Sequence, residues 1–233
     1  MAHIITDISR PSEADMALAR SVTPATIHEA QDRSGALDPA IQPVKPGLTL
    51  CGPAVTVQCT PGDNMMLIAA IGTAQPGDVL VVSAGGLRVQ GGFGEVLATA
   101  CMSRGIAGLV IDAGVRDGAA IRKLGFPVFS TGLAMHGTVK ETVGSVNHPV
   151  VIGGIVVHPG DVISGDDDGV VCLKRGDIDR VCKAGQAREE KEESMMAALR
   201  EGADILDLSG MRQRLVDKGC QWSGTVNKMD RTA

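Results

Sequence analysis

The chain has 233 residues and a formal net charge of −5, and 44% of its residues are hydrophobic while 21% are charged. This balance is typical of an ordinary globular protein and excludes extensive disorder. Aromatic residues make up only 2%, and no Lys/Arg run is long enough to follow a phosphate backbone, which argues against nucleic-acid binding. No apolar stretch reaches membrane-spanning length and the first fifteen residues carry charges, so we expect a soluble, cytoplasmic protein without membrane partners.

Strands and helices are predicted to alternate through the first half of the chain. Residues 13–33 favour helical segments interrupted at Pro24, with Thr23 as the N-cap of a helix over 25–33. The predicted strands cover 52–60, 77–86, 108–114 and 126–132. The helices between them cover 65–74, 94–105 and 117–125, and Asp63 or Asn64 caps the first of these. Such alternation predicts a parallel sheet covered by helices.

The second half of the chain has a different character. Residues 148–175 contain three short β-rich runs separated by turn signals, which indicates antiparallel hairpins. The acidic stretch 164–171 lacks the spacing of an EF-hand loop, so we interpret it as a solvated hairpin turn marked by Asp168-Gly169. Residues 176–218 are charged and helical. We predict one domain over 1–233, with a C-terminal helical arm at about 176–218 that has little to bury alone and contacts another subunit.

Cysteine spacing gives no sign of a disulfide framework or a zinc site. No two cysteines form a CxxC pair, and no histidines follow them at zinc-finger spacing. Most lie within apolar segments, where a thiol behaves as a small hydrophobe. We therefore interpret all six as reduced thiols: Cys51, Cys59, Cys101, Cys172, Cys182 and Cys220.

Two predicted strand ends carry the residues best suited to chemistry. One is "SAGGLRVQGGFGEVL", which leads into the helix at Gly94, and the other is "DAGVRDG", which leads into the helix at Asp117. Ligands bind beyond the carboxyl ends of parallel strands, so neighbouring strands would direct two helix N-termini at one anion, a phosphate or a carboxylate. The glycine loop lacks a complete G-x-G-x-x-G and any P-loop, and Glu95 would repel a pyrophosphate. Nucleotide binding is therefore disfavoured.

Arg116 and Asp117 are the central candidates. The guanidinium of Arg116 is a planar fork suited to a carboxylate. Asp117, with Glu29 and Glu95, offers oxygen ligands, and several carboxylates around one anion require a divalent cation such as Mg²⁺, which keeps most of its waters. The alternative is that Arg116 and Asp117 only cap a helix and form a surface ion pair. The residue types alone leave both interpretations open.

Longer sequence motifs favour the interpretation of Arg116 and Asp117 as a functional site. The segments "GDNMMLIAAIGTAQPGDVLVV", "GGFGEVLATACMSRGIAGLVIDAGVRDG" and "GSVNHPVVIGGIVVHPGDVISGDDDGVV" resemble the RraA-like family over about residues 20–200. Within that family the chain is most similar to the class II pyruvate aldolases that cleave 4-hydroxy-4-methyl-2-oxoglutarate or 4-carboxy-4-hydroxy-2-oxoadipate. The distinctive feature is G-E-x-L-A followed by Arg-Asp, with Arg116 placed 21 residues after Glu95.

The resemblance implies both a fold and a site. The fold is an α/β, compact β/β/α sandwich with a mixed sheet, of the swivelling-domain type, assembled as a homotrimer or homohexamer. The implied substrate contacts are Arg116 and the backbone amides of Gly94, Glu95, Val96 and Leu97. Asp117 would contact Mg²⁺ or Mn²⁺ directly, and Glu29 and Glu95 would hold or deprotonate a water. Glu192, or by register Glu193, would reach a neighbouring subunit's metal-bound waters.

The implied reaction is a retro-aldol cleavage. A divalent cation polarises the 2-keto group, and Arg116 stabilises the pyruvate enolate left when the C3–C4 bond breaks. The products are pyruvate and either oxaloacetate or a second pyruvate, with oxaloacetate decarboxylation as a side activity, in bacterial catabolism of aromatic compounds. Two other functions remain: a non-catalytic ribonuclease E regulator of the same fold, and a methyltransferase, which the incomplete glycine motif disfavours.

Overall fold

A computed structural model describes residues 2–222, and its contacts divide the chain into two compact units, Met1–Ala187 and Arg188–Ala233. The first unit contains all the strands and the helices that cover them. The boundary falls inside the predicted helical arm. The two units are described separately below.

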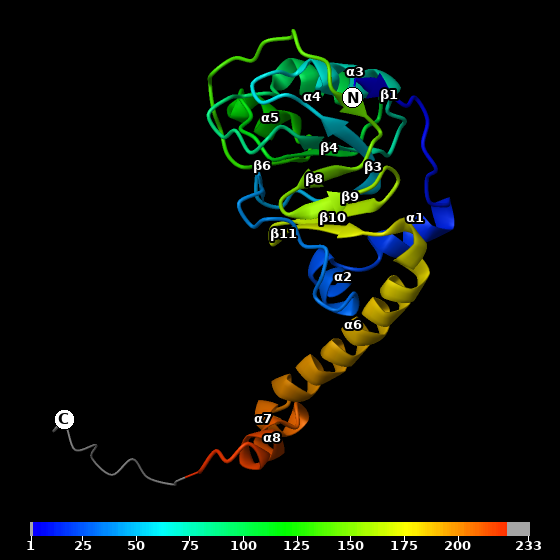
Figure 1. Ribbon diagram of the computed structural model, residues 1–233. Helices are drawn as coiled ribbons and strands as arrows, with labels where there is room; N and C mark the ends of the chain where they lie inside the picture. The colour runs from blue at the N-terminus through cyan, green and yellow to red at the C-terminus, as the bar shows by residue number, and fades with distance from the viewer. Residues whose placement is uncertain (1, 223–233) are drawn as a thin grey trace, which may run out of the picture. The chain divides into compact units, whose positions relative to one another are not determined.

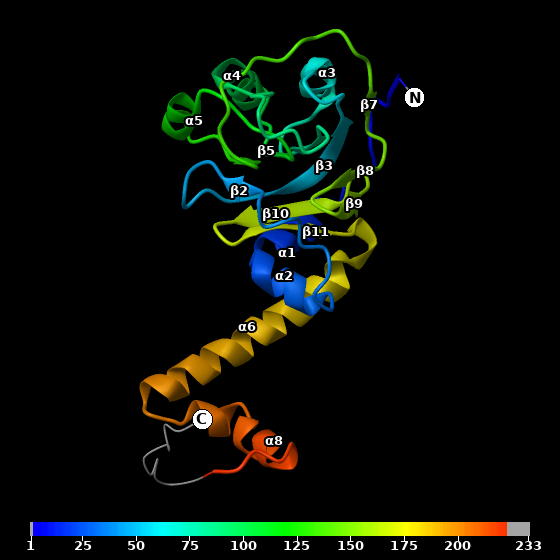
Figure 2. The same cartoon turned by 60° about the vertical axis from the view of Figure 1, so that its left-hand side comes forward.

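A parallel sheet forms the centre of the first unit. Its strands are β3 (Leu50–Gln58), β4 (Val79–Ser83), β5 (Gly108–Ile111) and β6 (Val128–Ser130), each parallel to the next. One face is covered by α3 (Met65–Thr73), α4 (Glu95–Ser103) and α5 (Gly118–Leu124), as Figures 1 and 2 both show. The predicted alternation of strands and helices is confirmed, with boundaries shifted by a few residues.

Both faces of this sheet are buried. Its strands are therefore continuous apolar runs and do not alternate between apolar and polar residues. In β4, Leu80 and Val82 belong to the core beneath the helices, while Val79 and Val81 belong to the core on the opposite face. Successive side chains of a strand point to opposite faces, so one unbroken apolar run serves two cores.

A second β layer covers the other face of the sheet. Strand β10 (Val162–Asp166) pairs antiparallel with both β3 and β11 (Gly169–Leu173). Strands β8 (Val150–Ile152) and β9 (Ile155–Val157) form a separate hairpin. The predicted antiparallel hairpins and the turn before Gly169 are confirmed, although the region holds four strands instead of three runs.

A third core lies beneath the β10–β11 hairpin. It is closed by α1 (Glu13–Arg20), α2 (Pro24–Ala30) and the first turns of α6 (Ile178–Arg200), which follow a 3₁₀ turn at Arg175–Asp177. Thr23 caps α2 as predicted, because its side chain accepts the Thr26 N–H. The helix ends three residues earlier than predicted. The next turn contains Asp32 and Arg33, whose positive φ angles do not continue a right-handed helix.

Three two-residue strands were not anticipated. They are β1 (His3–Ile4), which runs parallel to β7 (Ser145–Val146), and β2 (Gln42–Pro43), which is antiparallel to β6. β7 also pairs antiparallel with β3. Two residues carry no readable periodicity, so their pairing is set by distant partners. Together with β10 and β11 they make the sheet mixed. The α/β sandwich expected from the resemblance is therefore the observed fold.

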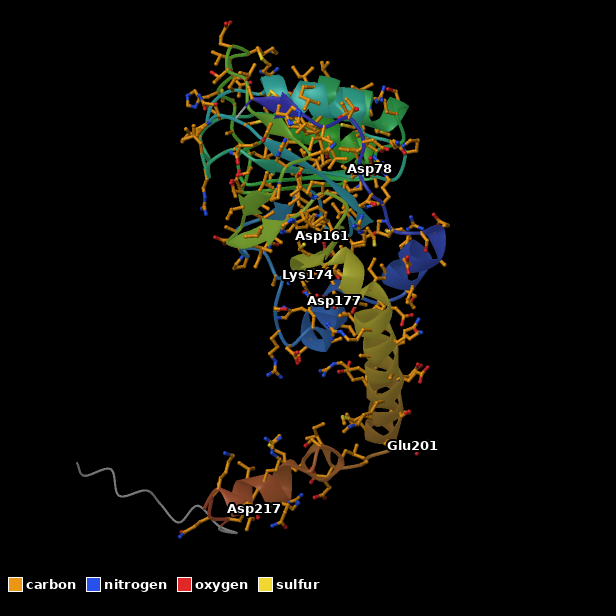
Figure 3. All side chains as sticks on the ribbon, turned by 45° about the vertical axis from the view of Figure 1, so that its right-hand side comes forward. Asp78, Asp161, Lys174, Asp177, Glu201 and Asp217 are labelled. Carbon is orange, nitrogen blue, oxygen red and sulfur yellow. The ribbon has the colours of Figure 1, made fainter. Side chains whose placement is uncertain are left out.

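A buried ion pair fastens the N-terminal segment to the sheet. Arg10 donates to both carboxylate oxygens of Asp78, the residue before β4 that is labelled in Figure 3, and each of the two N···O distances is 2.8 Å. The Asp78 side chain is 1% exposed and that of Arg10 is 19% exposed. Asp78 raises the pKa of the Arg10 guanidinium through these hydrogen bonds, against the opposing effect of burial.

The buried cysteines are expected to be unreactive thiols. Burial raises the pKa of the Cys101 and Cys172 thiols to about 12 and of Cys59 and Cys182 to about 11. Such thiols stay protonated at neutral pH and are poor nucleophiles. No cysteine of the described chain is paired in a disulfide.

The second unit is helical. It contains the end of α6, then α7 (Ile205–Leu208) and α8 (Met211–Asp217). From residue 188 to 222 no side chain is buried, and Ile205, Val216 and Trp222 are among the exposed apolar residues. This agrees with an arm that buries little alone, while its contact with another subunit stays a prediction. No helix within residues 2–222 is long and apolar enough to cross a membrane.

Candidate active site

The candidate site lies where β4 and β5 end. These strands are parallel neighbours, as the site prediction required, and α4 and α5 start beside each other after them. The loop before α4 reaches its neighbours through single backbone bridges, which join Gly91 to Gly114 and Gln90 to His136. Three loops therefore meet at one edge of the sheet, the edge at which α/β proteins bind their ligands.

Glycines allow these loops to touch. A Cβ atom on Gly91 would lie 2.5 Å from the Ala134 carbonyl oxygen, and one on Gly94 would lie 2.5 Å from Oδ2 of Asp117. The Arg116 N–H also donates to the Phe93 carbonyl oxygen at 2.8 Å. The glycine-rich sequence thus serves the close approach of two loops, which explains why it does not follow a nucleotide-binding pattern.

Asp117 has an unusual backbone conformation. Its φ is +57°, in the left-handed region, which costs about 1–2 kcal/mol for a residue with a Cβ, although Asp tolerates it better than most. Its side chain does not cap its own helix, α5. Instead, Oδ2 accepts the Glu95 N–H of α4 at 3.1 Å and lies 3.7 Å from Nε of Arg116.

The Arg116–Asp117 pair remains open to solvent. Half of the Arg116 side chain and 42% of the Asp117 side chain are exposed. The capping interpretation is therefore correct in part: Asp117 caps a helix, but the neighbouring one. The remaining exposure leaves both side chains accessible to a ligand.

The structure brings together only some of the predicted site residues. Gly94 and Glu95 begin α4 next to Arg116 and Asp117, and Val96 and Leu97 follow in its first turn. The Glu95 N–H, one of the amides expected to hold the substrate, already donates to Asp117.

Glu29 lies elsewhere in the first unit. It is on α2, which packs against β10 and β11 on the opposite side of the sheet from α4 and α5 (Figures 1 and 2). Its carboxylate accepts from Arg33 at 3.1 Å. A single chain therefore does not bring Glu29 to Arg116. Glu192 belongs to the second unit, where it pairs with Arg188 at 2.8 Å.

An open groove of about 440 Å³ runs beside the pair. Its lining consists of Val115, Arg116, Asp117, Gly118, Leu133, Ala134 and Met135. Leu133 and Met135 were not singled out from the sequence, because an exposed apolar loop residue has no pattern of its own. Met135 is 87% exposed, so this wall of the groove is apolar and accessible.

Asp112 is a second residue whose role was missed. Its carboxylate follows β5 and accepts the Ala84 N–H at the end of β4. Burial raises the pKa of Asp112, while the N–H groups of Ala84 and Gly86 act in the opposite direction. Asp112 thus holds the start of the glycine loop. A polar residue directly after a buried strand was the available signal.

The donor set at Asp117 fits a weakly held magnesium ion. Within the described part of the chain, no three His, Cys, Asp or Glu side chains gather closely enough to form a metal cluster. Mg²⁺ often uses one or two carboxylates and completes its octahedron with waters and substrate oxygens, whereas a structural zinc site needs four protein ligands. The partly exposed Asp117 carboxylate beside the exposed Arg116 is compatible with the former.

These features define an α/β protein with an exposed arginine–aspartate pair beside an open groove at the carboxyl edge of its sheet. The chain belongs to the RraA-like family: the sequence model described as Aldolase/RraA matches residues 23–172. The match spans the parallel sheet, the site and the hairpins, in agreement with the resemblance read from the motifs.

Individual relatives carry different names. The chain is 33% identical over 180 residues to a Halalkalibacterium halodurans protein named "Putative 4-hydroxy-4-methyl-2-oxoglutarate aldolase", covering 77% of this chain and 86% of the relative. Streptomyces coelicolor RraAS2, described as an unusual member of the RNase ES inhibitor RraA family, is 30% identical with a TM-score of 0.74, covering 81% of this chain and all of that one. An uncharacterised protein from Pseudomonas syringae pathovar tomato is 25% identical with a TM-score of 0.77, covering 87% and 100%.

Proposed function

We propose that the protein is a metal-dependent carbon–carbon lyase that releases pyruvate from 4-hydroxy-2-oxo acids with two or more carboxylates. The substrates are 4-hydroxy-4-methyl-2-oxoglutarate and 4-carboxy-4-hydroxy-2-oxoadipate, with oxaloacetate decarboxylation as a side activity. The observation that carries this proposal is the exposed Arg116–Asp117 pair beside an open groove. The named aldolase relative supports the same reaction class.

In this proposal Arg116 binds the carboxylate of the pyruvyl end. The proton of the C4 hydroxyl passes through a water to the Glu95 carboxylate, the C3–C4 bond breaks, and its electron pair becomes the enolate of pyruvate; the same proton can return through the water to C3. Arg116 then faces a larger negative charge than in the ground state, so its contribution grows in the transition state. Protonation at C3 releases pyruvate, and the other fragment leaves as oxaloacetate or a second pyruvate.

Asp117 is the residue that would hold Mg²⁺ or Mn²⁺. The ion would supply Lewis-acid polarisation of the 2-keto oxygen. Glu29 and Glu192 take part only in a homotrimer or homohexamer, where a neighbouring copy would carry them to the site. The role of Asp117 does not depend on that assembly.

Coupling pyruvate release to lactate dehydrogenase tests the proposal. With Mg²⁺ and 4-hydroxy-4-methyl-2-oxoglutarate, the purified protein is expected to consume NADH, and EDTA is expected to abolish the rate. A reaction with metal but without protein is essential, because divalent ions alone decarboxylate oxaloacetate. Absence of metal-dependent release above that background, for either aldol substrate, would contradict the lyase function.

The likeness to RraAS2 favours a second candidate, a ribonuclease regulator acting as a binding protein. It predicts that the immobilised protein retains ribonuclease E and lowers its cleavage of RNA, with no release of pyruvate. The Arg116→Ala variant separates the two functions, since it should lose lyase activity and keep any ribonuclease binding that uses a different surface.

A further inference from the structure

A small, partly open cavity lies beneath the glycine loop that leads to the candidate site. It is bounded by the segment before α3, by the ends of β4 and β5, and by the loop itself; Cys59, Asn64, Leu67, Gln90, Ile111 and Thr138 are among its lining residues. The space open to the centre of a water molecule is about 10 Å³. That is close to the minimum that holds one ordered water.

Two buried polar atoms of this lining have no partner within the described chain. They are Oδ1 of Asn64 and Oε1 of Gln90. Asn64 as a residue is only 9% exposed. Its amide orientation is fixed, because its Nδ2 donates to the Gly92 carbonyl oxygen at 2.9 Å, which leaves Oδ1 as the unsatisfied atom. Buried acceptors without donors are uncommon in folded proteins, so both atoms require an explanation.

The chemistry of the two atoms selects the occupant. Both are neutral acceptors, so neither can satisfy the other, and an occupant that serves both must donate two hydrogens. Asp63 also lines the cavity, but its carboxylate already accepts the N–H groups of Met65, Glu141 and Thr142. A metal ion would find two amide oxygens there, too few for Mg²⁺ or Ca²⁺. Water has the required size and the required donors.

We propose that this cavity is a binding site for one structural water molecule, which donates its two hydrogens to Asn64 Oδ1 and Gln90 Oε1. The water links the glycine loop to the start of α3, in addition to the direct Asn64–Gly92 hydrogen bond. Gly92 directly precedes Phe93, whose carbonyl oxygen receives the Arg116 N–H. The site therefore lies one residue away from the backbone that positions Arg116.

A crystal structure of the whole protein at a resolution that shows ordered waters provides the direct test. We expect one density peak about 2.7–3.2 Å from both amide oxygens. An empty cavity would overturn the proposal. So would an anomalous peak at this place after soaking with rubidium chloride, because it would identify a monovalent cation instead.

A variant tests the link to the candidate site. Gln90→Met keeps the length of the side chain and removes the acceptor, so the water peak should disappear. If the glycine loop loosens as expected, KM for the aldol substrate rises about threefold to tenfold, the worth of one hydrogen bond, with kcat within twofold. Gln75→Met, the same change at an exposed residue before β4, should alter neither.

The electron density and the KM value test different parts of the proposal. The kinetic readout rests on the proposed lyase function, whereas the density does not, so an inactive protein would leave the water site decided by crystallography. A Gln90→Met structure that keeps the peak at full occupancy would show that Gln90 does not hold the water, and would overturn the proposal as stated. A lost peak with an unchanged KM would remove the connection to the site.

Discussion

The first unit contains an Arg–Asp pair at each edge of its parallel sheet, and the two pairs are built in opposite ways. Arg10 and Asp78 are 68 residues apart in sequence, form two hydrogen bonds of 2.8 Å and are largely buried before β4. Arg116 and Asp117 are adjacent in sequence and follow β5. Nε of Arg116 lies 3.7 Å from Oδ2 of Asp117, and about half of each side chain is exposed. The residue types are the same, so composition cannot separate their roles.

Geometry does separate them. In the Arg10–Asp78 pair Nε and Nη2 of Arg10 donate to Asp78, Nη1 donates to Asp7, and Asp78 also accepts the Gln75 N–H. Nothing about this pair favours a ligand. Arg116 and Asp117 are held by their backbones, one through Phe93 and the other in a left-handed conformation, while the charged ends stay accessible. A stabilising pair uses up its hydrogen-bonding capacity, whereas a binding pair keeps part of it open.

The largest effect is expected from Asp117→Asn. Asn tolerates the left-handed conformation and can still accept the Glu95 N–H, so the substitution removes the charge with little backbone strain. We expect kcat/KM to fall about 100- to 1,000-fold, the range seen when a transition-state charge stabiliser is lost. The melting temperature should change by less than about 2 °C. Magnesium titrations of coupled pyruvate release, with thermal melts beside them, measure both. An unchanged titration would place the metal ligand elsewhere.

Asp78→Ala should have the converse effect. It leaves the partly buried Arg10 with only the exposed Asp7 as an acidic partner. Breaking a buried pair costs about 3–5 kcal/mol, and we expect the lower end because Arg10 is one-fifth exposed and keeps Asp7. The melting temperature should fall by about 6–12 °C, while kcat of the proposed lyase reaction, measured on the folded protein, is unchanged.

Asp179 provides the matched control for Asp78. It pairs with Lys183 on the surface, where both side chains are about two-thirds exposed. Asp179→Ala should cost less than about 1 kcal/mol. Equal losses for Asp78→Ala and Asp179→Ala would remove the distinction between a buried stabilising pair and a surface pair.

The same substitution in both pairs gives a smaller and more discriminating effect. Lys keeps the charge of Arg but lacks the planar fork. Arg116→Lys should lower kcat about tenfold or more, equivalent to about 1.4 kcal/mol, with little change in melting temperature. Arg10→Lys should lower the melting temperature by a few degrees, about 1 kcal/mol for the lost hydrogen bond, and leave kcat unchanged. A change confined to KM in Arg116→Lys would reduce Arg116 to a ground-state anchor.

The sequence predicts local features of this molecule much better than distant ones. The strand and helix alternation, the Thr23 cap and the hairpin before Gly169 are each determined by a few neighbouring residues. The pairing of β1 with β7 joins residues 3 and 145, and two-residue strands carry no pattern that could indicate it. Arg10 and Asp78 likewise meet only because the N-terminal segment returns to the sheet.

The candidate site follows the same rule. The two strand ends that form it could be picked out, because strand ends and glycine loops are visible in the sequence. The pairing of strands β4 and β5 was a condition of that interpretation, and the structure meets it. The left-handed conformation of Asp117 and its contact with Glu95 could not, because both depend on how two loops pack. Glu29 stays a prediction: its residue type suits the chemistry, but within one chain α2 lies on the other side of the sheet, so its role depends on a neighbouring copy.

Asp63 adds to this comparison an aspartate whose carboxylate is held by backbone N–H groups instead of an arginine. Its substitution is expected to have the smallest effect on stability. Asp63 as a residue is 5% exposed, and its carboxylate accepts three backbone N–H groups, from Met65, Glu141 and Thr142. Burial alone would raise the pKa of Asp63, but the three N–H groups outweigh it and lower that pKa below its ordinary value. The charged form is therefore favoured by folding, as it is for a carboxylate paired with arginine.

The sign of the pH dependence follows from that direction. A carboxyl whose folded pKa is lowered contributes stability that is complete above its ordinary pKa, near 3.8, and is lost as the pH falls through the lower, folded value. Asp63→Asn should be less stable than the wild type at pH 7, because its amide group faces N–H donors. The difference in unfolding free energy should shrink as the pH falls below about 4, because the unfolded wild type binds a proton at Asp63 before the folded protein does.

Urea unfolding of both proteins from pH 7 down to the limit of folding measures this difference. Asp179→Asn, at an exposed residue, is the control that reports general acid destabilisation. A difference between wild type and Asp63→Asn that stayed constant through the acid range would mean that the pKa of Asp63 is the same in the folded and the unfolded protein. Backbone N–H groups would then be insufficient to replace an arginine, and the loop that Asp63 holds would depend on packing alone.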